Sequence, residues 1–330
     1  MGTSPMPDNE GGQAHVPVLL AEVLAALAPL AGARVVDGTF GAGGYSRALL
    51  EAGATVTAID RDPNVRRFAD ALAAEFGDRF TFVPGTFSEL DQFAGGSPDA
   101  VVLDIGISSM QVDEAGRGFS FMREGPLDMR MAGEGETAAD LVNTLDEKSL
   151  ANLLFAYGEE RRSRRIAAAI VAARAETPIT TTTALAALIE RTIGRKPGEM
   201  HPATRSFQAL RIAVNDEFGQ LVEGLFAAER ILPEGGRLAV VSFHSLEDRI
   251  VKRFLDPEKA APTRSRHLPQ VQSALSPWRE VRKAMKAGRT ELERNPRSRS
   301  AVLRSALRSA SPARPVDRAG LGVPGRGGDR

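Results

Sequence analysis

The segment Val35–Gly44 constrains the fold of this chain more than any other part of the sequence. It reads VVDGTFGAGG, two β-branched residues and an acid followed by a glycine-rich turn, and a run of helical composition, Tyr45–Ala52, comes directly after it. Glycines let a ligand approach the backbone closely, and the N–H groups of a helix's first turn point towards such a ligand. The segment therefore predicts the entrance of a nucleotide-cofactor pocket.

The turn also has two other interpretations. Glycine-rich turns between a strand and a helix occur for packing reasons alone. A dinucleotide-binding turn has the spacing G-x-G-x-x-G, but counting from Gly41 places Ser46 at the third glycine. This weakens the nicotinamide dinucleotide interpretation. Asp37 followed by the glycines instead resembles the first motif of class I S-adenosylmethionine-dependent methyltransferases.

A second acid supports a nucleoside ligand. Asp60 ends a β-rich run nineteen residues after Gly41, and an acid at this place in a βαβ unit accepts hydrogen bonds from ribose hydroxyls. A nearly equal alternative is that Asp60 caps a helix that begins near Pro63. Asp62 fills that cap equally well, which leaves Asp60 for the ribose.

Further β-rich runs at 80–83, 100–104 and 237–242 predict an α/β protein with a doubly wound, mostly parallel sheet. About 130 residues separate the last two runs, far more than a single-helix crossover needs. We therefore expect an inserted all-helical domain. Its helices are predicted near residues 137–144, 148–157, 162–175, 183–192 and 206–228.

The expected domain organisation follows from these boundaries. Residues 15–112 and 216–308 form the cofactor-binding domain, and residues 113–215 form the insertion. A chain of 330 residues is long enough for such a core and a second lobe. Residues 1–14 and the segment 309–330, which is rich in Arg, Pro and Gly, are expected to be disordered.

The chain contains no cysteine. This excludes thiolate zinc sites, iron–sulfur clusters and disulfides, and we expect no metal site. Methylation of pyrimidine carbon 5 normally needs a cysteine nucleophile, so a methyltransferase with this sequence would transfer to nitrogen or oxygen. The lack of a long apolar run and of a signal-peptide pattern predicts a cytoplasmic protein without membrane contact.

The net charge of zero conceals an uneven distribution. Residues 1–150 hold 10 Lys and Arg against 23 Asp and Glu, whereas residues 151–330 hold 32 against 19. Such asymmetry favours a polyanionic partner, and nucleic acid is the leading candidate. For any single arginine, a solvated helix face or an internal ion pair is the more probable role. The basic clusters are Arg161–Arg165, Arg264–His267, Arg279–Lys286 and Arg294–Arg308.

Seven motifs in order resemble one family over roughly His15 to Arg308. That family is the bacterial 16S ribosomal RNA cytosine-N4 methyltransferases, the MraW or RsmH type. Seven motifs along nearly the whole chain are specific, although each alone is modest. The motifs are DGTFGAGG from Asp37, AIDRD from Ala58, DIGISS from Asp104, RGFSFMREGPLDMRM from Arg117, HPATR from His201, SFHSLEDR from Ser242 and NPRSRS from Asn295.

The resemblance implies methyl transfer from S-adenosylmethionine to the exocyclic amine of a cytosine in the decoding centre. The implied partner is 16S rRNA in the small ribosomal subunit, and a homodimer is one assembly that stays open. Tyr45 stands where the family more often has histidine, so a backbone contact is expected there. The implied cofactor-binding residues are Gly43, Gly44, Tyr45, Asp60, Phe87, Asp104 and Gln111.

The chemistry narrows the candidates for catalysis. The N4 amine is a poor nucleophile, so in-line placement and acceptors that orient its hydrogens should supply most of the rate. The candidate acceptors are the Asp104 carboxylate, the Ser108 and Ser109 hydroxyls and backbone carbonyls, with His244 after the fifth strand. His244 would stack on the base or accept a proton; the alternative is an ordinary hydrogen-bonding role at the strand end.

The insertion is expected to grip the substrate through its arginines, above all those at 161, 162, 164 and 165. Phe119 and Phe121 are candidates for stacking a flipped-out base, with burial in the insertion's core as an equal alternative. Two rival functions also remain at this point. One is a methyltransferase for another substrate, and the other is a non-catalytic RNA-binding factor.

Overall fold

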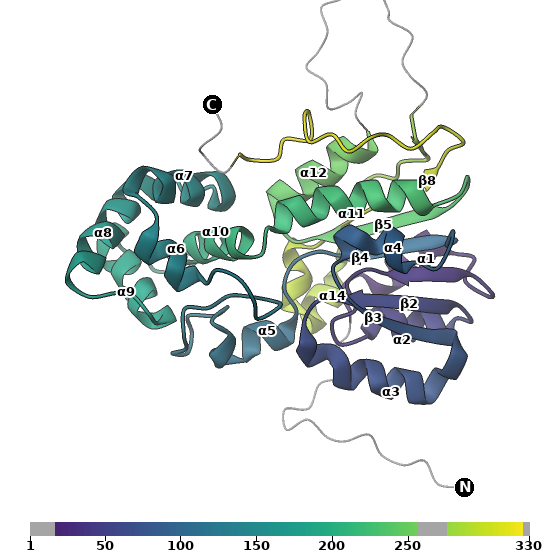
Figure 1. Ribbon diagram of the computed structural model, residues 1–330, viewed down its shortest axis with the longest axis horizontal. Helices are drawn as coiled ribbons and strands as arrows, with labels where there is room; N and C mark the ends of the chain where they lie inside the picture. The colour runs from purple at the N-terminus through teal and green to yellow at the C-terminus, as the bar shows by residue number, and fades with distance from the viewer. Residues whose placement is uncertain (1–16, 257–275, 326–330) are drawn as a thin grey trace, which may run out of the picture.

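The computed structural model describes residues 17–256 and 276–325 (Figure 1). Within these ranges, eight strands form one sheet in the order β3-β2-β1-β4-β5-β8-β6, with β7 also paired to β8. Strands β1 to β5 run parallel, and β6, β7 and β8 pair antiparallel. The bounds are β1 Arg34–Asp37, β2 Thr55–Asp60, β3 Phe80–Pro84, β4 Ala100–Asp104, β5 Arg237–Ser242, β6 Trp278–Arg279, β7 Met285–Lys286 and β8 Val302–Arg308.

The predicted α/β class with a mostly parallel sheet is confirmed. Strands β2, β4 and β5 have the predicted bounds, because buried β-branched runs that end in a polar residue are strong strand signals. Strands β6, β7 and β8 were not predicted. Arginines break the apolar pattern of β8, and Arg304 is accommodated there by two hydrogen bonds to Asp248, at 2.6 and 3.0 Å.

Helices cover both faces of the sheet. Adjacent strand residues point to opposite faces, so Val35 belongs to one apolar cluster and Val36 to the other. The first cluster contains residues of α1, α2 and α3, and the second contains residues of α4, α11 and α12. The bounds are α1 Leu20–Leu27, α2 Gly44–Glu51, α3 Arg66–Phe76, α4 Leu90–Phe93, α11 Glu217–Ile231, α12 Ser245–Leu255 and α14 Arg289–Arg294.

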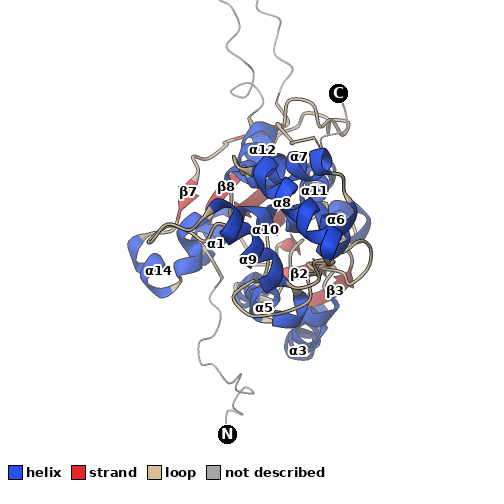
Figure 2. Cartoon of the chain, turned by 90° about the vertical axis from the view of Figure 1, so that its left-hand side faces the viewer, coloured by secondary structure: helices blue, strands red, loops and turns tan. Residues whose placement is uncertain are grey.

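A helical lobe is inserted between β4 and β5 and lies to the left of the sheet in Figure 1. Figure 2 views the molecule from that side, with the helices in front of the strands. The side chains of Thr137, Asp146 and Thr181 accept capping hydrogen bonds at the starts of three of these helices. The bounds are α5 Ser109–Asp113, α6 Ala138–Thr144, α7 Glu147–Gly158, α8 Ser163–Glu176, α9 Thr182–Ile193 and α10 Thr204–Val214.

The single helix predicted over 206–228 is wrong, because the structure has α10 and α11 with a break between them. Asp216 adopts φ 46° in the left-handed region. The side chain of Asn215 stabilises the break with two hydrogen bonds. The Asn215 amide donates to the Met129 carbonyl at 2.7 Å and accepts from the Met131 N–H at 2.9 Å. These partners are about 85 residues away, so the local sequence pattern does not reveal the break.

The tail also differs from expectation, because residues 309–325 lie against the sheet domain instead of being disordered. The Arg314 guanidinium is 2.6 Å from Glu229 and lies over the Phe254 ring at 4.6 Å. Glu229 is fully buried and needs a cationic partner. The predicted disorder at 1–14 and 326–330, and the cluster Arg264–His267, lie outside the described residues.

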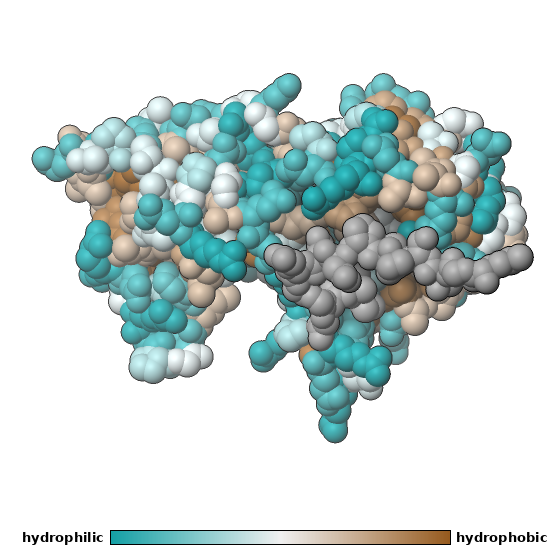
Figure 3. All heavy atoms as spheres, turned by 90° about the horizontal axis from the view of Figure 1, so that it is seen from below, coloured by the Kyte–Doolittle hydropathy of each residue, from teal (hydrophilic) through white to brown (hydrophobic). Residues whose placement is uncertain are grey.

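Seen from below, the molecule has two lobes with a recess between them, and hydrophilic and hydrophobic residues are intermixed on this face (Figure 3). Among the described residues, no helix combines the length and the apolar character that crossing a bilayer requires.

Candidate active site

Three carboxylates end neighbouring parallel strands, Asp37 on β1, Asp60 on β2 and Asp104 on β4, and so gather at one edge of the sheet. Asp37 is fully buried. It accepts hydrogen bonds from the Ser46 hydroxyl at 2.7 Å and the Thr39 N–H at 3.1 Å. Ser46 stands where a dinucleotide fingerprint has its third glycine, so this position holds an acid in place.

The glycine turn between β1 and α2 has the conformation that its sequence predicts. Gly41 has φ 56° and Gly43 has φ 80°, a region that side-chain-bearing residues rarely adopt. A Cβ atom at Gly44 would lie 2.3 Å from Pro17. The Gly41 N–H donates to Asp60 at 2.7 Å, which ties the turn to the end of β2. Gly43 and Gly44 therefore lie where the turn after β1 meets α2, and their contact with a cofactor stays a prediction.

Tyr45 and Phe87 have different settings. The Tyr45 ring is buried and its hydroxyl donates to the Val18 carbonyl, so a cofactor contact at Tyr45 involves its backbone only. Phe87 packs against two glycines. A Cβ at Gly38 would lie 3.0 Å from Phe87, and one at Gly224 would lie 2.4 Å away. The Phe87 Cβ is the atom close to Gly38 and the ring is the part close to Gly224, so these glycines let Phe87 pack between the end of β1 and α11.

Asp60 and Asp62, at the end of β2, have different hydrogen-bonding roles. Asp62 accepts from the Asn64 N–H at 3.0 Å, so it caps the 3-10 turn Pro63–Val65, as the sequence predicts. The two Asp60 oxygens accept backbone N–H groups from Gly41 and Asp62. Each oxygen keeps a second lone pair. Asp60 also lines a hollow of about 280 Å³.

Gln111 and Ser108 form a capping box at the start of α5. The Gln111 side chain accepts from the Ser108 N–H at 3.1 Å, and the Ser108 hydroxyl accepts from the Gln111 N–H at 3.3 Å. The Gln111 amide donates to Asp62 at 2.8 Å, and Arg117 is 3.0 Å from the same carboxylate. Ser108 therefore orients Gln111, and Gln111 and Arg117 link the segment after β4 to Asp62 after β2.

Asp104 is the least satisfied acid of the site. Its Oδ1 atom is buried and has no hydrogen-bond partner among the described residues. Burial, with the nearby charges of Asp37 and Glu247, raises the pKa of Asp104 to about 8. Burial also raises the pKa of Asp37 to about 6 and raises that of Asp60. A cationic ligand at this edge would relieve the repulsion between these groups.

His244 has both ring nitrogens directed at Glu247. Its Nδ1 accepts from the Glu247 N–H at 3.4 Å at the start of α12, and its Nε2 lies 3.0 Å from Glu247 Oε1. The ring packs edge-on against Phe218. This arrangement favours the hydrogen-bonding role at the strand end over proton acceptance. The sequence signal for it is the spacing of a capping box, His244 followed three residues later by Glu247.

One trio in the described residues has the composition of a metal site, namely Glu217, His244 and Glu247. Arg211, however, donates to both Glu217 oxygens, at 2.7 and 2.8 Å. Burial raises the pKa of Glu247, but His244 and Arg211 outweigh it and hold that pKa below its usual value. The arginine supplies the counter-charge that a cation would otherwise supply.

The aromatic candidates for base stacking are largely internal. Phe119 is buried, and the Phe121 ring lies 4.6 Å from that of His201 and 4.8 Å from that of Phe207. Packing within the insertion is therefore the role that the structure supports. Sequence reasoning did not identify Arg61 as a contact between the sheet domain and the insertion. Its guanidinium donates to the Asn215 carbonyl, at the break between α10 and α11, at 3.1 Å.

The sheet order, the antiparallel strand β8, the glycine turn after β1 and the acids after β1, β2 and β4 together define a class I methyltransferase. Comparison with known proteins narrows the class. A model of the MraW methylase family matches residues 12–309. The chain therefore belongs to the MraW methylase family.

Two relatives with more than half of their residues identical agree with this assignment. The chain is 58% identical over 314 residues to the ribosomal RNA small subunit methyltransferase H of Cereibacter sphaeroides, which covers 94% of this chain and 95% of the relative. It is 59% identical over 322 residues to the protein of the same name from Azorhizobium caulinodans, with 95% and 93% covered. Among solved structures, an rRNA methylase from Streptococcus thermophilus has 12% identity and a TM-score of 0.40, with 90% and 99% covered.

Proposed function

We propose that this methyltransferase uses S-adenosylmethionine to methylate the N4 amine of a cytosine in the decoding centre of 16S rRNA. The observation that carries the cofactor assignment is the group of carboxylates Asp37, Asp60 and Asp104 at one sheet edge. S-adenosylmethionine carries a sulfonium and an ammonium, which such a site attracts, whereas the pyrophosphate of a dinucleotide would be repelled.

The residues present fit this cofactor. Asp60 has lone pairs for both ribose hydroxyls, Phe87 supplies an aromatic face, and the turn at Gly43 and Gly44 admits the methionine part. Asp104 supplies a buried oxygen that lacks a partner. Bound at this edge, S-adenosylmethionine would supply a methyl group on a positively charged sulfur. The proposed contact of Gln111 is indirect, through Asp62.

The protein's part in the reaction is placement and electrostatics. In the reaction the cytosine amine would take the methyl group while the carbon–sulfur electron pair stays on the sulfur, and the proton that the amine loses would pass to solvent. Asp104 and Ser108, at the end of β4, are the proposed acceptors that orient the amine hydrogens. His244 is assigned a supporting role, because its nitrogens face Glu247.

The choice of substrate rests on three supports. The relatives are named as methyltransferases of small-subunit ribosomal RNA, the second half of the chain is basic, and the absence of cysteine favours transfer to nitrogen over transfer to carbon 5. Ribosomal RNA in bacteria also implies a cytoplasmic protein. We propose that residues 113–215 form the substrate-recognition domain. Whether the protein forms a homodimer is to be tested by sedimentation.

The test uses the purified protein with methyl-labelled S-adenosylmethionine and either small subunits or free 16S rRNA. Nucleoside mass spectrometry should find label in N4-methylcytidine at one site. Label in another nucleoside, or in a ribosomal protein, would contradict the substrate assignment. Cofactor binding without transfer to any of these acceptors would instead support a non-catalytic RNA-binding factor.

A further inference from the structure

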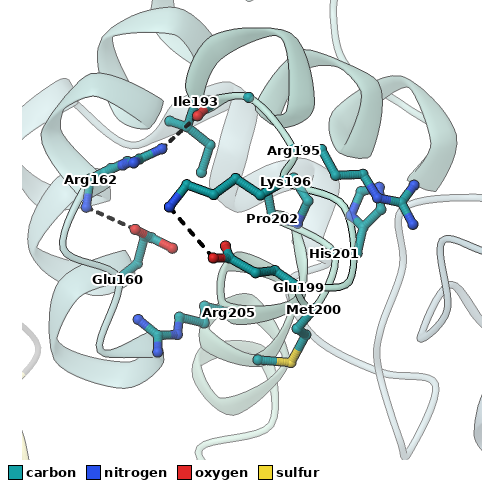
Figure 4. A pocket seen from close by; sticks show the side chains of 11 residues that line it. Glu160, Arg162, Ile193, Arg195, Lys196, Glu199, Met200, His201, Pro202 and Arg205 are labelled. Carbon is teal, nitrogen blue, oxygen red and sulfur yellow. Dashed lines mark hydrogen bonds and ion pairs between the residues drawn. The ribbon is translucent and has the colours of Figure 1, made fainter.

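A second hollow lies on the insertion, away from the strand ends that bear the acids. It has a volume of about 390 Å³ and is bordered by Glu160 and Arg162 before α8, by the end of α9 and by the segment 194–205 (Figure 4). Its lining holds four cations, Arg162, Arg195, Lys196 and Arg205, against two carboxylates, Glu160 and Glu199. The hollow therefore has a net positive lining.

Two of these arginines are held by backbone carbonyls. Arg162 donates to the Ile193 carbonyl at the end of α9, at 2.5 Å, and Arg205 donates to the Glu159 carbonyl at 3.2 Å. A carbonyl orients a guanidinium without neutralising it. Each guanidinium has five N–H donors, so both keep their charge and most of their donors for a ligand.

The other cations have weak partners. Lys196 is 3.5 Å from Glu199, and Arg195 is 3.9 Å from Glu190, and all four side chains are solvent-exposed. Exposed pairs of this kind contribute at most about 1 kcal/mol. A stronger anion can therefore displace the carboxylates. Figure 4 shows the side chains of Lys196 and Glu199, which come from the same segment, paired beside the hollow.

The lining suits a phosphate. The planar fork of one guanidinium matches two phosphate oxygens with two parallel hydrogen bonds, and Arg162 and Arg205 supply two such groups. His201 is the one aromatic side chain among these lining residues, and its ring already packs on Phe121, so the hollow offers no free platform for a base. Arg161, Arg164 and Arg165 are exposed at the start of the neighbouring α8 and extend the positive surface from the hollow.

We propose that Arg162, Lys196 and Arg205 form a binding site for a backbone phosphate of the RNA substrate. The proposal rests on the proposed function for the identity of the RNA, but the site itself recognises a phosphodiester and no base. It positions the RNA on the insertion at a distance from the methyl-transfer site.

The test uses Arg205→Gln and Lys196→Gln in the full-length protein, with Arg191→Gln as the matched control. Arg191 is exposed on α9 and does not line the hollow. Arg162 is left intact because it also holds the end of α9. The probe is a single-stranded 16S rRNA fragment, and its dissociation constant is measured between 50 and 200 mM KCl.

Each lining variant should bind the RNA about three- to ten-fold more weakly, and its salt dependence should fall by the equivalent of one phosphate contact. Thermal unfolding midpoints and S-adenosylmethionine affinity should not change. An affinity and salt dependence equal to those of Arg191→Gln would overturn the proposal. Saturable binding of inorganic phosphate, lost in Arg205→Gln with RNA affinity intact, would also overturn it by assigning the hollow to free phosphate.

These readouts are independent of the proposed function. A failure of methyl transfer to cytosine N4 would leave the binding measurements interpretable, because they contain no chemical step. Conversely, unchanged RNA binding by the lining variants with normal N4 methylation would remove only the phosphate site.

Discussion

Replacing Asp104 by asparagine should stabilise the ligand-free protein above neutral pH while weakening cofactor binding. The pKa of Asp104 is raised from 3.8 to about 8 in the folded protein, chiefly by burial. Between these two values the unfolded chain has lost the proton and the folded chain retains it. The folded state therefore binds more protons, and the stability of the wild type falls as pH rises through this window. The asparagine amide does not titrate and escapes this loss.

The size of the effect follows from the same numbers. Each pH unit of difference between folded and unfolded pKa corresponds to about 1.4 kcal/mol, so the upper limit above pH 8 is about 6 kcal/mol. Asp104 as a whole residue is only half-buried, and solvent reduces the effect. The amide also introduces a donor that costs about 1 kcal/mol if unsatisfied. We expect a net gain of about 1–2 kcal/mol at pH 8.5 and none at pH 4.

The assay is urea unfolding at pH 4, 6, 7 and 8.5, with Asp78→Asn as the control for an exposed aspartate. Titration calorimetry in buffers of different ionisation enthalpy should detect proton release when S-adenosylmethionine binds the wild type, because a cation favours the ionised form of Asp104. Wild-type affinity should rise with pH up to about 8, and the variant should bind more weakly with little pH dependence. A stability difference that is the same at pH 4 and pH 8.5 would refute the reasoning.

Three further predictions test the Arg117–Asp62 ion pair, the role of His244, and the exposed arginines at the start of α8. Arg117→Ala should lower the free energy of unfolding in urea by about 2–4 kcal/mol, because it leaves the Asp62 carboxylate, only 2% exposed, without its cation. Arg130 pairs with the more exposed Asp128, so Arg130→Ala should lower that free energy by under about 1 kcal/mol, and equal costs would contradict this. His244→Asn, which retains a capping side chain, should show near-normal single-turnover methylation at saturating cofactor, whereas a loss of about 100-fold would restore a catalytic role. Charge reversal at Arg161, Arg164 and Arg165 should weaken RNA binding by about ten-fold or more, and unchanged binding would show that this face does not contact the RNA.

The part of the fold that sequence reasoning predicted depends on local patterns. The runs that became β2, β4 and β5 are buried, β-branched and bounded by polar residues, so their period and ends are visible in the sequence. The glycine turn is equally local, because Gly41 and Gly43 require a left-handed backbone.

The features that escaped prediction depend on distant partners. The break at Asn215 is stabilised by the Met129 and Met131 backbone, and the order of the tail depends on Glu229, 85 residues before Arg314. Part of the basic half is likewise internal, because Arg308 is buried and donates to the Glu229 carbonyl. Net charge by segment therefore overstates the surface available to a nucleic acid.

The candidate site shows the same division between position and role. The sequence correctly predicted that Asp60 and Asp104 end strands and that Asp62 caps the turn after β2. It did not reveal that Gln111 would bond to Asp62, because packing that motifs do not specify decides which side chains meet across two loops.

The central claim is most directly tested by nucleoside mass spectrometry of 16S rRNA from cells that lack this protein, complemented either with the wild type or with Asp60→Ala. The account predicts that N4-methylcytidine disappears from one decoding-centre cytosine without the protein, returns with the wild type and does not return with the cofactor-site variant. Undiminished N4-methylcytidine at that cytosine in the deletion strain would contradict it.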